Sequence, residues 1–254
     1  MVSQEENHAS APRSGAEEFL REAERCFQGT LEQSQFRLGD AGFFEAACVF
    51  NPPLSGNMSD NLLDRVMAVH PALVDWPLWV DTRRRNLREL HPHLELGGVE
   101  CRVTGGKYSV ALPQFWRIEP TCLFFVEAVF EEDTVDRAST PVLDSAWRIR
   151  RVIDAIKYCL AFAKELGAGS DTRLEFAFRW TRLQGRVLRY AVPWGELGKM
   201  SSQSDHVLSQ TALPVPAGRK EILDAAERAL APLLGLFDAT VPPREWLENW
   251  CQDF

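Results

Sequence analysis

The sequence predicts an α+β fold in which a mostly antiparallel sheet packs against one long amphipathic helix, with additional N- and C-terminal helices. Three observations predict this class. Short apolar runs gather between residues 42 and 130, as strands require. Residues 145–166 have apolar side chains at helical spacing, and residues 172–183 alternate between apolar and polar side chains. A strand-rich middle followed by helix, strand and helix favours α+β over a parallel α/β fold.

The N-terminal part is expected to form a tail and a helix. Residues 1–13 are polar and predict a disordered tail, so residues 14–254 are expected to form a single domain. Ser14 and Glu17 form a capping-box pattern that opens a helix over residues 16–27.

The middle of the chain is rich in predicted strands. Asp60 is placed to cap a short helix over residues 61–69. From residue 98 onward, short turns between apolar runs predict antiparallel neighbours. The predicted strands are, in order, 42–50, 76–81, 98–103, 108–118 and 121–130.

The longest helix is predicted over residues 145–166, with Asp144 or Ser145 as its N-cap. Its apolar face follows the i, i+3, i+4, i+7 rule, and we expect Ile153 and Ile156 to be almost fully buried against the sheet. The charged residues outside that face, which we expect in solvent, are Arg148, Arg151, Lys157 and Lys164.

The strand predicted over residues 172–183 has two distinct faces. One face carries Leu174, Phe176, Phe178 and Trp180, and the other carries Arg173, Glu175, Arg179 and Thr181. The later segments are predicted as an irregular connection 186–205, an edge strand 207–216, a helix 219–237 and a short helix 242–250.

Composition and residue spacing narrow the classes of partner and the cellular compartment that we expect. The formal net charge is −8, which disfavours general affinity for nucleic acid, because phosphate neutralisation requires an excess of cations. The chain lacks an apolar run of about 18 residues, so we expect no membrane span. The first residues lack a basic start and an apolar core, so we expect no secretory signal. The six cysteines form no CxxC pair, which favours reduced thiols in the cytoplasm.

The sequence lacks the motifs of a phosphate-binding loop, a GxSxG hydrolase and a restriction-type nuclease. The Gly-Gly-Lys at 105–107 fails the phosphate-loop pattern, because Cys101 stands where Gly is needed and Tyr108 where Ser or Thr is needed. The chain has no GxSxG elbow and no acid two residues before a lysine, as a restriction-type nuclease would show. His91 and His93 are the most metal-like pair, but no third ligand accompanies them. We therefore expect a non-enzymatic chain without a metal or cofactor.

Tryptophan and arginine interleave at residues 76–85, 115–120 and 178–183. Planar rings and guanidinium forks can bind a nucleobase and a phosphate together. Alternation in a strand offers a second interpretation, with the rings in the core and the arginines on a solvated face. The candidate ligand- or partner-binding residues are Arg83, Arg84, Arg85, Arg117, Arg173 and Arg179.

The order and spacing of four blocks resemble those of a known family. The blocks are residues 69–84, 115–133, 143–188 and 225–238. Together they resemble the C-terminal companion region of bacterial proteins that begin with a Schlafen-type, AlbA-like nucleic-acid-binding domain. The resemblance covers about residues 60–240, and the AlbA-like domain itself is absent. It implies a companion or sensing module in a bacterial regulatory or antiphage defence setting, beside a separate effector chain.

These observations lead to one functional expectation and one alternative. We expect a non-enzymatic cytoplasmic sensing or adaptor module that binds a partner protein or a ligand, and a homo-oligomer is left open. The alternative is a nucleotide- or nucleic-acid-binding protein that uses the Trp- and Arg-rich sheet face. Salt dependence separates them, because phosphate contacts weaken steeply with salt.

Overall fold

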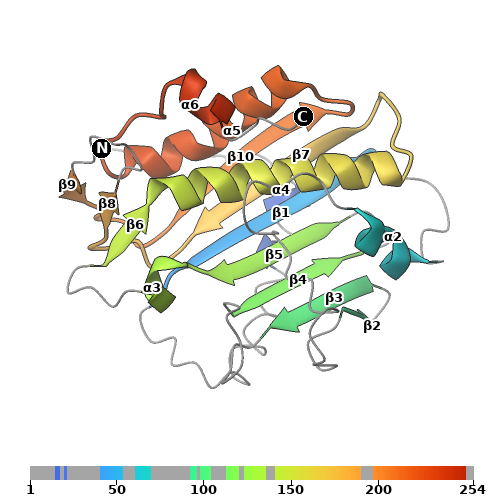
Figure 1. Ribbon diagram of the computed structural model, residues 1–254, viewed down its shortest axis with the longest axis horizontal. Coiled ribbons are helices and arrows are strands. Elements are labelled where there is room, and N and C mark those ends of the chain that lie inside the picture. Colours follow the sequence, from blue (N-terminus) through green and yellow to red (C-terminus); the bar gives the residue numbers. More distant parts are fainter. Residues whose placement is uncertain are drawn as a thin grey trace, which may run out of the picture.

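The computed structural model shows a broad sheet with two long helices across one of its faces (Figure 1). The predicted strand 76–81 and the candidate residues Arg83, Arg84 and Arg85 lie outside the described residues. The structure describes residues 15–17, 20–21, 41–53, 61–69, 92–95, 98–103, 113–119, 123–135, 141–189 and 197–249.

The main sheet has seven strands, and every neighbouring pair in it is antiparallel. The strand order is β10-β7-β1-β5-β4-β3-β2, which places β10 and β2 at the edges. This confirms the predicted fold class and the predicted edge strand. The strands are β1 (Phe43–Asn51), β2 (His93–Glu95), β3 (Gly98–Val103), β4 (Gln114–Ile118), β5 (Phe124–Val129), β7 (Arg173–Trp180) and β10 (Val207–Pro214).

Two long helices, α4 (Ser145–Glu165) and α5 (Arg219–Gly235), pack on the same face of this sheet and on each other (Figure 1). Asp144 is the N-cap of α4, because its carboxylate accepts a hydrogen bond from the Ala146 N–H at 2.9 Å. Gly167 follows the end of α4 with a φ of 75°, a conformation that glycine adopts without strain. None of the helices in the described part of the chain is long and apolar enough to span a membrane.

Three short helices also lie in the described part of the chain: α2 (Leu62–Ala68), α3 (Glu132–Val135) and α6 (Arg244–Asn249). The N-cap of α2 is Asn61, in the left-handed region with a φ of 62°, and not the predicted Asp60. The Tyr158 hydroxyl of α4 donates to the Val66 carbonyl at 3.1 Å, which ties α2 to the main helix.

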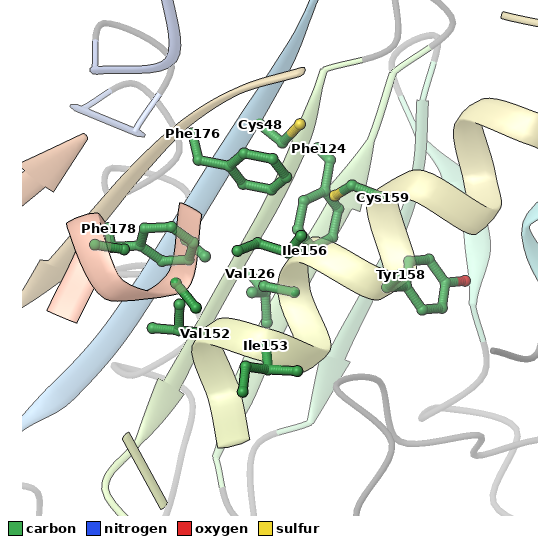
Figure 2. Packing of buried hydrophobic residues seen from close by; sticks show 14 of the residues in the cluster. Cys48, Phe124, Val126, Val152, Ile153, Ile156, Tyr158, Cys159, Phe176 and Phe178 are labelled. Carbon is green, nitrogen blue, oxygen red and sulfur yellow. The ribbon is translucent and has the colours of Figure 1, made fainter. Parts of the chain in front are cut away.

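The core lies between α4, α5 and the sheet (Figure 2). Phe176, Phe178 and Trp180 stand two residues apart on β7, and their rings stack at centroid distances of 5.7 and 6.1 Å. Ile153 and Ile156 of α4 are fully buried in the same cluster, as predicted. The apolar face of α4 and the apolar face of β7 therefore pack together in one core.

The segment predicted as an irregular connection, 186–205, contains two strands, so that prediction was wrong. In a small second sheet, β8 (Val187–Arg189) pairs in parallel with β6 (Val142–Asp144) and antiparallel with β9 (Leu197–Ser201). Strands as short as three residues are too brief to show a period. The partner β6 also lies more than 40 residues away in sequence, so its pairing with β8 leaves no local signal.

The prediction of a solvated charged face on α4 was also wrong for three of its four residues. Arg148, Arg151 and Lys157 are buried, and Lys164 near the C-terminal end of the helix is exposed. Buried cations need carboxylate or carbonyl partners. Arg148 and Arg151 find theirs in Glu131, which precedes α3 and whose position beside α4 is set by the tertiary fold.

Candidate functional site

The face of the main sheet away from α4, called the second face below, carries the candidate arginines. Alternation along β7 puts Arg179 on the side opposite Phe178 and Trp180, as predicted. The same alternation places Arg173 there, at the exposed start of β7. Arg117 reaches the second face from β4.

Arg179 is held by a buried carboxylate on the neighbouring strand. Its Nη2 donates to Glu45 Oε1 at 2.7 Å, and its Nε donates to Glu45 Oε2, which makes the contact bidentate. The Arg179 side chain is 16% exposed and that of Glu45 only 2%. Glu127 stands directly opposite Glu45 on β5. The interpretation with the rings in the core and the arginines in solvent therefore holds for the rings of β7 but not for Arg179, whose side chain is mostly buried.

A second ionic group on the same face surrounds Glu100 of β3. Arg117 donates to Glu100 and to Glu119 at 3.0 Å each, and Arg102 donates to Glu100 at 2.7 Å. Burial opposes the charge on Arg117, but hydrogen bonds and attraction from Glu119 and Glu100 outweigh it and raise the pKa of Arg117. The imidazole Nε2 of His93 lies 3.8 Å from Glu100.

Residues of the predicted N-terminal helix lie on the second face. Residues 15–17 and 20–21 are helical, which confirms the prediction for this described part. Ala16 and Leu20 are buried in an apolar cluster that is separate from the main core. Glu17 accepts a hydrogen bond from the Gln210 side chain of β10 at 3.0 Å. The other buried members of this cluster are Ala47, Val49, Phe115, Phe125 and Ala177.

The second face therefore combines paired charges, an apolar cluster and a helical segment that covers part of it. Around the cluster, Phe43, Leu123 and Leu208 are only partly buried. Gln210 and Arg173 are exposed toward the β10 edge. Such a surface offers partly exposed apolar side chains beside hydrogen-bonding groups.

No family model, curated protein or solved structure matches the chain. The resemblance to the companion region of Schlafen-type proteins stays a prediction. Within the described ranges, no three His, Cys, Asp or Glu side chains are grouped as a metal site requires.

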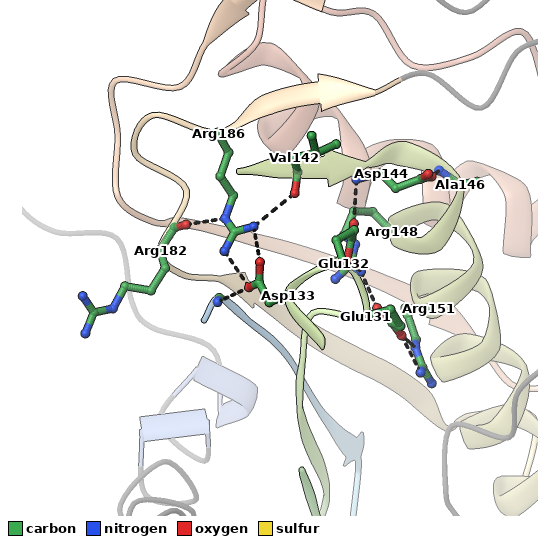
Figure 3. A network of polar contacts seen from close by, with 11 residues as sticks. Glu131, Glu132, Asp133, Val142, Asp144, Ala146, Arg148, Arg151, Arg182 and Arg186 are labelled. Carbon is green, nitrogen blue, oxygen red and sulfur yellow. Dashed lines mark hydrogen bonds and ion pairs between the residues drawn. The ribbon is translucent and has the colours of Figure 1, made fainter. Parts of the chain in front are cut away.

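A further cluster of charges, at the N-terminal end of α4, was not anticipated from the sequence (Figure 3). Arg148 donates to Glu131 at 2.5 Å and to Glu132 at 3.0 Å, and Arg151 donates to Glu131 at 2.7 Å. The guanidinium carbons of Arg148 and Arg186 lie 4.3 and 5.0 Å from the centre of the Phe130 ring.

Each acid of this cluster joins two parts of the chain. Asp133 accepts two hydrogen bonds from Arg186, at 2.8 and 2.6 Å, and one from the Gly42 N–H at 2.6 Å. Glu132 accepts from the Asp144 N–H at 2.6 Å, directly before α4. These contacts hold the start of β1, the end of β5 and the start of α4 together, so we interpret the cluster as structural.

The pKa values of the two neighbouring glutamates of the cluster, Glu131 and Glu132, are shifted in opposite directions. Burial works against the charge of Glu131, but Arg151 and Arg148 outweigh it and lower the pKa of this carboxyl. Burial raises the pKa of Glu132, which shares only Arg148 and also faces the charge of Glu131. Perturbed carboxyls occur in ion-pair networks as well as in active sites, and the contacts here explain both shifts.

Sequence reasoning found three arginines of the second face but missed Arg102 and the acids that pair with these arginines. Three of the six candidates, Arg117, Arg173 and Arg179, reach this one face. Glu45 had a visible signal, because it is a charged residue inside the apolar run 42–50. Pairing of Glu45 with Arg179 depends on strand register, which no local pattern contains.

Proposed function

We propose that this chain is a non-enzymatic module that binds a partner protein through the second face of its sheet. We place it in the cytoplasm, in a bacterial regulatory or antiphage defence system, on the strength of its resemblance over residues 60–240. The non-enzymatic part rests on the sequence, which lacks the phosphate-loop, hydrolase and nuclease patterns sought in it.

The single observation that carries this proposal is the pairing of arginines with carboxylates on the second face. Both oxygens of Glu45 occupy the fork of Arg179, and Glu100 and Glu119 hold Arg117. An arginine that binds phosphate presents its fork to the ligand. Paired arginines beside partly exposed apolar side chains instead favour a protein interface, in which charges set specificity around an apolar centre.

The test is co-purification of a partner with the full-length tagged chain expressed in its native host. The double variant Arg173→Glu, Leu208→Asp alters side chains on the second face that make no ion pair among the described residues. We expect it to lose the partner while it stays folded, with a lower melting temperature than the wild type because Leu208 packs on the apolar cluster. The matched control is Lys164→Glu, which reverses an exposed cation at the end of α4 and should keep the partner.

Retention of the partner by the folded double variant would remove the second face as the binding site. A different result would favour the nucleic-acid alternative. In that case the wild type would retain DNA or RNA, the double variant would release it, and retention would fall steeply with added salt.

A further inference from the structure

Among the described strands, β2 and β10 form the two edges of the main sheet, and they differ in length and charge. β2 has three residues and carries His93 and Glu95, and a short edge with polar side chains discourages pairing with another chain. β10 has eight residues, and none of the eight is charged. An uncharged edge strand of this length is a template for strand addition, so β10 needs protection from another part of the fold.

The hydrogen bonds between β10 and β7 show which backbone groups of β10 point away from the sheet. The Val215 N–H, one residue beyond β10, donates to the Thr172 carbonyl at 2.9 Å, in line with the register of the two strands. Backbone groups alternate between the two sides of an antiparallel strand, so the odd-numbered residues of β10 face β7. The residues whose backbone groups face outward are Leu208, Gln210, Ala212 and Pro214.

Arg228 of α5 contacts this outward edge. α5 packs on β10 (Figure 1), and Arg228 is an exposed residue of that helix. Its Nη2 donates to the outward-facing carbonyl of Ala212 at 3.1 Å, and its Nε donates to the Thr211 hydroxyl at 3.2 Å. Two residues further on, Pro214 has no N–H to offer to a new strand. At the C-terminal half of this edge, one carbonyl is therefore occupied and one N–H is missing.

The β10 strand of a second copy is complementary to this edge. A twofold axis at Gln210 would set the two strands antiparallel, with Leu208 of one copy opposite Ala212 of the other. No charged side chains would meet along the eight residues. In this pairing the Leu208 N–H would have to donate to the Ala212 carbonyl of the other copy. Arg228 already donates to that carbonyl, and the symmetry of the pair repeats the obstacle at both ends.

We infer that Arg228 blocks the outward edge of β10 against strand pairing with a second copy of this chain. Both hydrogen bonds that Arg228 makes in the described structure go to β10, as this role requires. The inference is independent of the proposed function, because it concerns the backbone edge of the sheet and not the side chains of the second face. An exposed arginine on a helix thereby keeps the sheet from continuing into another molecule.

The test compares the self-association of the full-length wild type and Arg228→Ala by sedimentation velocity over a series of protein concentrations. We expect Arg228→Ala to dimerise at least about tenfold more tightly than the wild type, because the symmetric pairing gains two carbonyls that Arg228 otherwise occupies. Arg228 is exposed, so the variant should stay folded, and its melting temperature checks this.

Two controls locate the effect. Arg219→Ala makes the same change at an exposed arginine of the same helix, whose described backbone contact is the Glu248 carbonyl, and its self-association should equal that of the wild type. The double variant Arg228→Ala, Ala212→Pro removes an outward N–H that the pairing needs, without removing a hydrogen bond to β7. Its self-association should return to the wild-type level.

Equal self-association of the wild type and the folded Arg228→Ala variant would overturn the inference. So would association of Arg228→Ala that persists when Ala212→Pro is added, because the contact would then lie away from the edge of β10. Association of Arg219→Ala as strong as that of Arg228→Ala would attribute the effect to lost charge and contradict it as well. A wild-type dimer that Ala212→Pro abolishes would show that the edge is open despite Arg228.

Discussion

Glu45 and Arg179 stand directly opposite each other on β1 and β7, and the guanidinium of Arg179 engages both oxygens of the carboxylate. Glu45 is also directly opposite Glu127 on its other side. Arg179 therefore supplies a cation next to two adjacent buried acids, Glu45 and Glu127. Its position on the second face links the stability of the sheet to the surface that we propose binds a partner.

The first prediction concerns this pair. Arg179→Glu should lower the free energy of unfolding by about 3 kcal/mol or more, because it leaves a buried carboxylate without its cation. Arg173→Glu, on the same strand but exposed, should change it by no more than about 0.5 kcal/mol. Urea denaturation of both variants measures the difference. Equal values would mean that the Arg179–Glu45 contact contributes nothing in solution.

The second prediction concerns the core under α4. Ile153→Ala and Ile156→Ala should each cost about 2–5 kcal/mol, from lost transfer free energy plus the cavity that remains. Both side chains are fully buried. Lys164→Ala, exposed near the end of the same helix, is the control and should stay within about 0.5 kcal/mol of the wild type. A small loss at both isoleucines would contradict the packing of α4 on the sheet.

The third prediction separates the two glutamates of the α4 cluster. Glu131→Gln should destabilise the protein by about 3–5 kcal/mol, because Arg148 and Arg151 both lose their shared carboxylate. Glu132→Gln should cost clearly less, because burial already raises the pKa of that carboxyl and the amide oxygen still accepts from the Asp144 N–H. Chemical denaturation at neutral pH ranks the two variants.

The contributions of Glu131 and Glu132 to the free energy of unfolding depend on pH in opposite ways. The pKa of Glu131 is lowered from 4.5, so its stabilisation is present above that pH and is lost as pH falls through the lower folded-state value. The pKa of Glu132 is raised, so stability falls as pH rises from 4.5 through the higher folded-state value. In a stability profile measured from about pH 3 to pH 7, Glu131→Gln should flatten the limb below pH 4.5, and Glu132→Gln should reduce the decline above pH 4.5.

The fourth prediction compares two glycines. A Cβ atom on Gly42 would lie 2.3 Å from the Phe130 ring and 2.9 Å from the Thr181 carbonyl, so Gly42→Ala should cost about 1–3 kcal/mol or more. Gly235 ends α5 with open space around it, so Gly235→Ala should stabilise by about 0.4–1 kcal/mol. Melting temperatures that move in the same direction would contradict this close approach at Gly42.

Local periodicity explains which elements were predictable. The alternation over 172–183 and the helical spacing over 145–166 each repeat several times, and both elements formed within two or three residues of the predicted bounds. The short turns after residue 98 likewise predicted the antiparallel order of β3, β4 and β5. The three-residue strands β6 and β8 have no such repeat, so only their pairing reveals them.

The sequence by itself determined the fold class, the two faces of β7 and the placement of Arg173 and Arg179 on one of them, because strand and helix periods are local properties. Only the tertiary structure decided which charges are buried and which partners they have. Arg148 and Glu131 are 17 residues apart and Arg179 and Glu45 are 134 apart, and neither pair follows from a local pattern. Burial of a cation depends on a carboxylate that the fold brings from elsewhere, and strand register and helix packing control that approach.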